Sequence, residues 1–242
     1  MKILIPTAKE LNKKALEVPE ELLGEKTKNI IDEFADKKPE ELAKIYKIKE
    51  DKAQEEYVRW QNLANYSAKS YRALELFNGL MYRNISRDNF TKEDAEYIKK
   101  NVYITTALYG VINAYEAIHE HRLDFLQNVK IKDSSLKNLW REDYDRSVEN
   151  DEVIISLLSS EFEEVFSKTI REKFIKITFM EEKNGDLKTH STISKKARGK
   201  FLSEIIKRKI TNIREVETIK FDGFEYKFEL STENNLAFVA KR

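Results

Sequence analysis

Apolar positions along the chain repeat with two different periods, and segments of the two kinds follow one another from end to end. A short apolar run at Lys2–Ile5 is typical of a buried strand, whereas apolar residues between Leu22 and Phe34 recur with helical spacing. Val102–Thr105 is apolar and β-branched, and Val153–Leu158 is the clearest candidate for a central strand. Because strands are scattered among helices without a repeat or linker, the pattern predicts one α+β (mixed α/β) domain over residues 1–242, with a mixed sheet flanked by many helices.

Capping and turn residues bound several further elements. Pro39 fits the first position of a helix, and Asn184-Gly185 fits a type I′ turn between the two strands of a hairpin. Thr91 with Asp94 approximates a capping box, and Ser134 or Ser135 is expected to cap another helix. The remaining expected elements are helices at 67–77 and 161–166, and strands at 80–85, 174–181, 187–193, 224–230 and 236–240.

Composition limits the chemistry that the chain can perform. Its 242 residues are 36% charged, but the formal net charge is only +1, so any affinity for nucleic acid has to come from local patches. The chain has no cysteine, which excludes disulfides, thiolate metal sites, iron–sulfur clusters and a cysteine-based peroxide sensor. No apolar run approaches the roughly 20 residues that cross a bilayer. The N-terminal apolar run is too short for a signal peptide, so we expect a cytoplasmic protein without a membrane partner.

Positive charge is concentrated where a helix is expected to begin. Ser194 is predicted to cap a helix that runs to about Ile210, and its first turns carry Lys195, Lys196, Arg198 and Lys200. Each cation at the start of a helix is destabilising by about 0.3–1 kcal/mol, because the helix dipole is positive at that end. A bound anion would offset this unfavourable interaction. Phosphate fits, because backbone N–H groups and cationic side chains bind it together. The alternative interpretation is a solvated helix start paired with acidic neighbours.

Residues Leu42–Ala53 have the spacing of a helix-hairpin-helix element, which we place at about 39–60. In that motif, glycines in the hairpin let backbone amides approach DNA phosphates without contacting the bases. Lysines stand at both glycine positions here, and lysine resists the positive φ that glycine allows. The candidate phosphate contacts of this element are Lys44, Lys47, Lys49 and Lys52.

Histidine and serine clusters carry weaker signals. His119 and His121 hold metal-compatible atoms, but two residues apart on a helix they would point to different sides, so we expect a partly exposed helix end. His190 is expected to be a structural residue in a strand. Ser159-Ser160-Glu161 follows a buried strand and opens a helix, which resembles an anion-binding turn. No Walker loop, dinucleotide fingerprint or serine-hydrolase motif occurs, so we expect no catalytic residue, metal or cofactor.

Several segments, in the same order from one end of the chain to the other, resemble the YaaA family of bacterial peroxide-stress proteins. The two most specific segments are Leu108-Tyr109-Gly110-Val111 and Lys195-Lys196-Ala197-Arg198-Gly199. The others are Ile3 to Lys9, Phe77 to Tyr82, Arg122-Leu123, Leu139-Trp140 and Leu158 to Phe162. The resemblance implies a mixed fold with a basic cleft, a helix-hairpin-helix element, DNA binding, and a role in limiting iron-driven oxidative damage. Pro6-Thr7 and Asn113-Ala114 depart from the family pattern; the first change leaves Lys9 in place, and the second removes a cation.

The leading hypothesis is therefore a non-enzymatic protein that binds DNA (duplex, branched or bulged) without sequence preference. Phosphates would be neutralised by Lys9, by the hairpin lysines and by the cations of the 194–200 segment. Arg72, Arg83 and Arg122 are expected to line the same cleft, and Tyr46, Tyr71 and Tyr82 are candidates for stacking on unpaired bases, with core packing as the alternative.

The rival hypothesis is an enzyme that acts on a nucleotide or another phosphorylated metabolite in a closed anion pocket. Lys9, Arg122, Arg198 and the Ser159-Ser160 turn would hold the phosphate, and Glu161 would be the general base. The shape of the site distinguishes the two, since a small deep pocket favours the enzyme and an open basic groove favours DNA. Direct iron sequestration is a third hypothesis. The sequence gives it little support, because three histidines and no cysteine supply few of the usual iron ligands.

Overall fold

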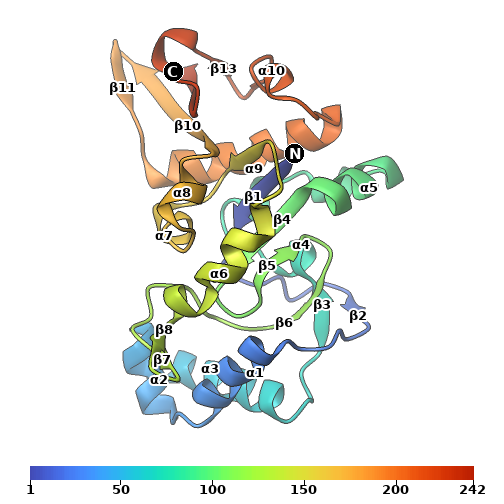
Figure 1. The fold of residues 1–242 in the computed structure, drawn as a ribbon, viewed down its shortest axis with the longest axis vertical. Coiled ribbons are helices and arrows are strands. Elements are labelled where there is room, and N and C mark those ends of the chain that lie inside the picture. The colour runs from blue at the N-terminus through green and yellow to red at the C-terminus, as the bar shows by residue number, and fades with distance from the viewer.

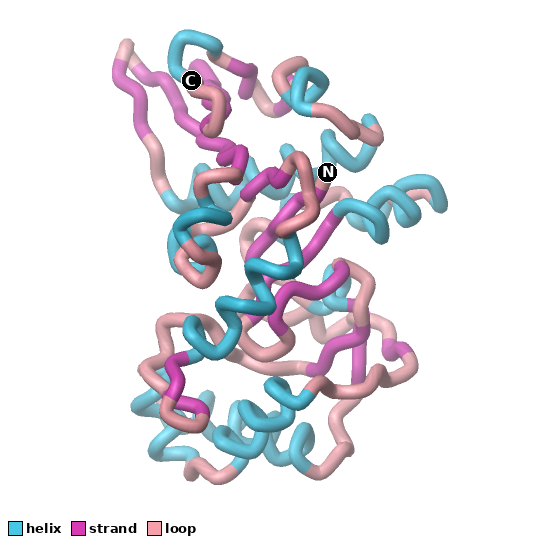
Figure 2. The backbone as a smooth tube through the Cα atoms, viewed as in Figure 1, coloured by secondary structure: helices cyan, strands magenta, loops and turns pink.

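The computed structural model describes all residues 1–242, and its centre is a nine-stranded mixed sheet. Strands run through the middle of the molecule with helices around them, as Figure 2 shows. The order is β12-β13-β14-β10-β9-β1-β4-β5, with β11 paired to β10. The middle strands β14, β10, β9, β1 and β4 are mutually parallel, and β5, β12 and β13 pair antiparallel at the two sides. The predicted α+β fold with a mixed sheet is confirmed.

The strands of this sheet are β1 (Lys2–Pro6), β4 (Val102–Thr106), β5 (Gly110–Asn113), β9 (Ile154–Ser156), β10 (Phe174–Lys183), β11 (Asp186–Lys188), β12 (Lys220–Phe221), β13 (Phe224–Tyr226) and β14 (Asn235–Lys241). A small sheet holds β2 (Glu17–Val18), β3 (Ser70–Arg72) and β6 (Ala117–His119), and β7 (Lys130–Ile131) pairs with β8 (Ser134–Ser135).

The long helices are α1 (Glu25–Ala35), α2 (Pro39–Tyr46), α3 (Glu50–Ala64), α5 (Lys92–Asn101), α6 (Leu136–Val148) and α9 (Ser191–Arg208). Single turns form α4 (Ala73–Leu76), α7 (Ser160–Glu163), α8 (Lys168–Arg171), α10 (Ile213–Val216), and the 3-10 turns η1 (Tyr82–Asn84), η2 (Arg87–Asn89) and η3 (Phe228–Leu230). In Figure 1, α1–α3 lie together at the lower end, and α9 crosses the upper part.

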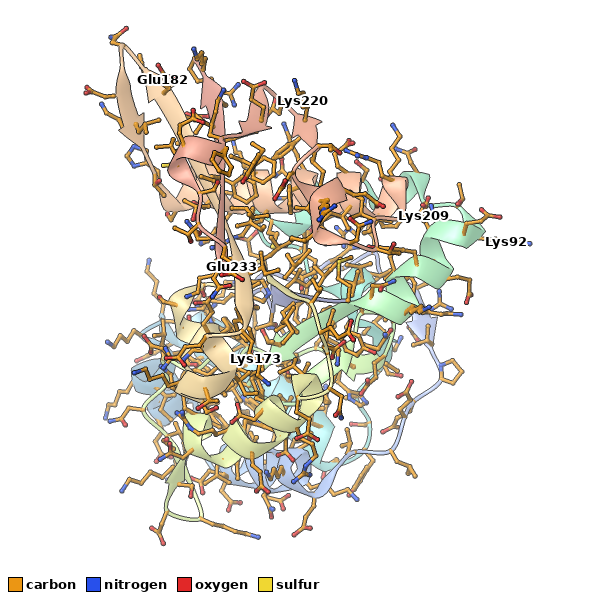
Figure 3. All side chains as sticks on the ribbon, turned by 45° about the horizontal axis from the view of Figure 1, so that its top comes forward. Lys92, Lys173, Glu182, Lys209, Lys220 and Glu233 are labelled. Carbon is orange, nitrogen blue, oxygen red and sulfur yellow. The ribbon has the colours of Figure 1, made fainter.

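Two apolar cores lie on the two faces of the main sheet. Successive side chains of a strand point to opposite faces, so Ile3 and Ile5 join one core while Leu4 joins the other. The first core is covered by the apolar stripe of α9, with Phe201 and Ile205 fully buried. The second core contains α6 and the packed helices α1–α3. Figure 3 shows charged side chains over the outer surface, with Lys92 projecting away from the molecule at the end of α5.

Several local expectations are confirmed. Thr91 and Asp94 form the reciprocal capping box of α5, and the Ser135 hydroxyl accepts a hydrogen bond from the Asn138 N–H at the start of α6. Asn184 and Gly185 have φ values of 55° and 84°, as a type I′ hairpin requires. The segment 153–158 contributes β9, which lies between β1 and β10 in the centre of the sheet. The caps and the turn depend on contacts between near neighbours in the sequence, whereas β9 pairs with β1, about 150 positions away.

Other expectations are wrong, because partners distant in sequence decide the backbone. The segment predicted as a helix at 67–77 contains β3, which pairs with β2 and β6, followed by the single turn α4. The strand predicted at 80–85 is the 3-10 turn η1, in which the Asn84 N–H bonds to the Met81 carbonyl. The strands predicted at 187–193 and 224–230 end early, at Lys188 and Tyr226.

Helix α9 begins at Ser191, three residues before the predicted cap at Ser194. His190 is its N-cap residue, so its assignment to a strand is wrong. The cations Lys195 and Lys196 therefore lie beyond the first turn, where the dipole argument for an anion no longer applies to them. The reasoning for a phosphate site has to come from the side-chain geometry described below.

The segment predicted as a helix-hairpin-helix consists of α2 and α3, joined by a three-residue turn at Lys47–Lys49. Pro39 occupies the first position of α2, as expected. Lys47 ends α2 in the left-handed region with φ 52°, which is the conformation that glycine adopts most readily. The assignment of this pair as a helix-hairpin-helix stays a prediction.

Candidate functional site

A cleft of about 590 Å³ opens at the carboxyl ends of the parallel strands β1 and β9. Chain segments that follow two parallel strands meet at the same edge of a sheet, which is where open α/β sheets bind ligands. Thr7 to Lys9 follow β1 and line one side of the cleft, and Ser159 and Glu161 follow β9 and line another. The strand order therefore brings together two segments about 150 positions apart in the sequence.

Helix α9 supplies the opposite wall. Thr192, Lys195 and Arg198 are spaced by three residues, so they lie along one side of the helix, and all three line the cleft. Lys196 and Lys200 point elsewhere, and the ammonium of Lys200 lies 2.7 Å from the Asp222 carboxylate. The register of α9 thus separates the cations of the Lys-Lys-Ala-Arg-Gly-Lys segment into two that face the cleft and two that do not.

Two glycines hold the third wall in place. Segment 79–83 lies between the loop after β1 and α9, and a Cβ at Gly79 would approach the Cβ of Ala8 to 2.8 Å. A Cβ at Gly199 would collide with the carbonyl oxygen of Met81 and lie 2.9 Å from the Cβ of Asn84. Backbone packs directly on backbone at Gly199, and the backbone of Gly79 packs on the Ala8 Cβ, so neither position has room for a side chain. Both glycines belong to the motif segments identified in the sequence.

The cations of the cleft differ in whether they already have acidic partners. Lys9 lies 2.5 Å from Asp124, and Arg83 is ion-paired with Glu10 and donates a hydrogen bond to the Asn78 carbonyl. Lys195 and Arg198 form no ion pair in the structure.

The Arg198 guanidinium is partly buried in the wall of the cleft. Its Nε is buried and has no hydrogen-bond partner among the protein's own groups. Burial lowers the pKa of Arg198, and the nearby Glu163 opposes that shift. Arginine stays protonated in proteins even so. A buried Nε without a partner costs free energy, and an anion bound at the guanidinium would recover part of that cost.

Carboxylates face these cations across the cleft. Glu161 accepts a hydrogen bond of 2.9 Å from the Phe125 N–H, and its pKa is raised first by burial and then by the neighbouring Asp124. Asp124 is itself only 4% exposed. The cleft therefore has a cationic side on α9 and an acidic side at Asp124 and Glu161, where Lys9 is paired with Asp124.

Of the residues predicted for the site, the structure brings four together in the cleft: Lys9, Arg83, Lys195 and Arg198. The hairpin lysines Lys44, Lys47, Lys49 and Lys52 belong to α2, α3 and their turn, none of which lines it. Arg72 lies 3.7 Å from Glu75 and over the Tyr115 ring at 5.4 Å, and it does not line this cleft.

Arg122 also lies outside the cleft, with its Nε buried and unpartnered. It is close enough to Glu56 of α3 to lower the pKa of that carboxyl, although burial raises it more. Tyr82 and Tyr46 are not available to stack on bases, because the Tyr82 hydroxyl donates to the Pro6 carbonyl and the Tyr46 hydroxyl accepts from Trp60. Both rings are buried, as the core-packing alternative expected.

The expected helix end at His119 and His121 is also wrong. His119 ends strand β6, and both imidazoles are buried. Burial lowers the pKa of His121 to about 4. The structure contains no group of three or more His, Asp or Glu side chains arranged to hold a metal ion.

The sequence reasoning missed Asp124, Leu126 and Thr192 as cleft residues. Asp124 appears in no motif of known chemistry, and Leu126 reads as an ordinary apolar position. Thr192 was placed in a strand, and it becomes identifiable only once α9 starts at Ser191. None of the helices is both long and apolar enough to cross a membrane.

Comparison with known proteins gives consistent results. A family model described as "Peroxide stress protein YaaA" matches residues 1–230. A UPF0246 protein of Streptococcus gordonii is 51% identical over 241 residues, covering 100% of this chain and 99% of that protein. A UPF0246 protein of Streptococcus uberis is 46% identical, with 98% of each chain covered, and one of Streptococcus thermophilus is 45% identical, with 100% and 98% covered. The chain therefore belongs to the YaaA family of peroxide stress proteins.

Proposed function

We propose that this protein acts in the cytoplasm during peroxide stress as a non-enzymatic, sequence-independent DNA-binding protein. The observation that carries the proposal is the Arg198 guanidinium, which lies in the cleft with a buried Nε and no acidic partner. Lys195 stands one turn away on the same side of α9, also unpaired. Two unpaired cations at one cleft favour a ligand that carries phosphate.

Binding through the phosphodiester backbone explains how a chain of net charge +1 would hold DNA. The cleft cations supply the local positive charge, and Lys47 and Lys49 at the hairpin turn are proposed as a second set of backbone contacts. Phosphate contacts carry no sequence information, so affinity would depend on salt and little on base sequence.

A protein that occupies the DNA backbone would limit iron-driven damage without binding iron. Hydroxyl radicals formed from Fe²⁺ and hydrogen peroxide attack DNA from solution, and covered segments would be cleaved less. A cleavage assay with Fe²⁺ and peroxide tests this role. We expect protection by the wild-type protein and reduced protection by the Lys195→Ala variant at equal protein concentration.

The direct test measures binding to duplex, single-stranded and junction DNA by fluorescence anisotropy at several salt concentrations. Each phosphate contact contributes about −0.9 to the slope of log K against log salt concentration on duplex DNA. Lys195→Ala should reduce both the affinity and this slope, whereas Lys196→Ala makes the same charge change on the same helix outside the cleft and should do less. A slope near zero, or equal losses in the two variants, would contradict binding at the cleft.

A second candidate is an enzyme that acts on a nucleotide or another phosphorylated metabolite. The specific observation in its favour is Glu161, whose raised pKa suits a general base and which lines the same cleft as the unpaired Arg198. Incubation with nucleotides, followed by mass spectrometry, tests for turnover. Product formed by the wild type and lost in Glu161→Gln, with DNA affinity unchanged in that variant, would favour the enzyme.

A further inference from the structure

We propose that the cleft is a binding site for a single nucleotide unit, with its phosphate at Lys195 and Arg198 and its base against the apolar wall that contains Leu126. The inference rests on the proposed function, because it concerns the same cleft, and it narrows the ligand from a DNA backbone to one nucleotide. It also assigns a side of the cleft to each part of that nucleotide.

The size of the cleft limits what can enter it. Its volume of about 590 Å³ lies within the range of roughly 300–1,000 Å³ that is typical of small-molecule sites. Two base-paired strands do not fit in such a space, whereas a nucleoside with one phosphate does. A duplex bound at this surface would therefore leave the interior of the cleft unused.

The distribution of charge fixes the direction of the ligand. A phosphate is attracted to Lys195 and Arg198 on α9 and repelled by the carboxylates on the other side. Glu161 would instead accept hydrogen bonds from groups that carry N–H or O–H, such as ribose hydroxyls and exocyclic base amines, whereas Asp124 is already paired with Lys9 and accepts from the Leu126 N–H. Inorganic phosphate would make no favourable contact with this acidic side, because it is itself an anion.

An apolar wall completes the site. Leu80, Leu123, Leu126 and Phe162 all line the cleft. Leu126 is 67% exposed and lines the cleft, so its apolar side chain is accessible to a ligand there. Bases held outside a double helix are commonly packed against aromatic or apolar side chains. Phosphate-binding cations, hydrogen-bond acceptors and an apolar wall together match the three chemical parts of a nucleotide.

The first experiment is titration calorimetry of the full chain with nucleoside 5′-monophosphates, with adenosine and inorganic phosphate as fragments. We expect the monophosphates to bind about tenfold or more tightly than either fragment, since both sides of the cleft are used. Lys195→Ala should bring the affinity for the nucleotide down to that for the nucleoside. Leu126→Ser should weaken the binding of both ligands. The matched controls are Lys196→Ala and Leu22→Ser, because Leu22 is fully exposed and lies outside this cleft.

A second arm distinguishes a free nucleotide from a nucleotide that belongs to a DNA strand. Single-stranded DNA containing 2-aminopurine should change in fluorescence on binding if one of its bases enters the cleft, and Leu126→Ser should abolish that change while anisotropy still reports binding. Free nucleotide binding alone would support the site and count against DNA as its natural ligand. Anisotropy showing DNA binding, with neither nucleotide affinity nor a 2-aminopurine signal, would overturn the inference and leave the DNA-binding proposal standing.

Discussion

Replacing Gly199 by alanine tests whether the close packing of α9 on segment 79–86 builds the cleft. The added methyl group would collide with the Met81 carbonyl and approach backbone atoms of Asn84 to 3.0 Å. Gly199 is buried, and backbone atoms cannot rotate away as a flexible side chain would. The segment is further tied to α9 by the Ser86 N–H, which donates a 2.9 Å hydrogen bond to Ser203 Oγ.

Two opposing contributions determine the size of the effect. Alanine stabilises a helix interior relative to glycine by about 1 kcal/mol. Overpacking in a close contact costs about 1–3 kcal/mol, and a collision with backbone belongs at the upper end of that range. We therefore expect Gly199→Ala to lower the free energy of unfolding by about 1–2 kcal/mol. For a chain of this size, that corresponds to a fall in Tm of about 2–8 °C.

Calorimetry and urea unfolding would measure the change, with Ser194→Ala as the control. Ser194 lies on the same helix, and its side chain makes no hydrogen bond, so alanine there improves helix propensity without a collision. The control should melt at the wild-type temperature or slightly above. If Gly199→Ala melts as high as Ser194→Ala, the steric argument is wrong and the glycine is not required for packing.

Three further predictions follow from individual backbone and titration features. Lys47→Gly should raise the free energy of unfolding by about 1 kcal/mol, because Lys47 has φ 52°, and a lower Tm would contradict this. Thr91→Ala should cost about 1 kcal/mol in urea unfolding through loss of the α5 cap, and an unchanged midpoint would refute it. The pKa of His121 is lowered by burial to about 4, so the unfolded chain binds more protons between pH 6.5 and 4 and stability should fall as pH falls through that window. The fall should be smaller in His121→Gln, and equal pH dependence in both proteins would exclude His121 as its source.

Local signals in the sequence were sufficient for part of the fold. The type I′ hairpin at Asn184-Gly185, the cap at Thr91 and the first position of α2 at Pro39 each depend on a few consecutive residues. The alternation at Ile3, Leu4 and Ile5 was enough to indicate a strand buried on both faces. The motif segments were also sufficient to identify the family, because their order along the chain is itself a sequence property.

Tertiary contacts decided the remaining elements. Residues 70–72 form a strand because β2 and β6 supply backbone partners, and those strands lie about 50 positions away on either side. Segment 80–85 forms a 3-10 turn because it is packed between α9 and the loop after β1. The absence of a side chain at Gly79 and Gly199 leaves room for this packing. Neither partner is visible from the local pattern of apolar residues, which is why both elements were assigned the wrong structure.

The candidate site shows the same division. Sequence alone determined that the Ser194–Lys200 segment is unusually basic, and that Ser159 to Glu161 follows a buried strand. The tertiary structure decided which of those cations face the cleft, since the packing of α9 turns Lys195 and Arg198 toward the cleft and Lys196 away from it. It also brought Asp124 to the cleft, where it pairs with Lys9. The parallel order of β1 and β9 joins the segments of Lys9 and Glu161, which no sequence spacing connects. Side-chain direction and strand order are properties of the folded chain, and they determine the chemistry of the cleft.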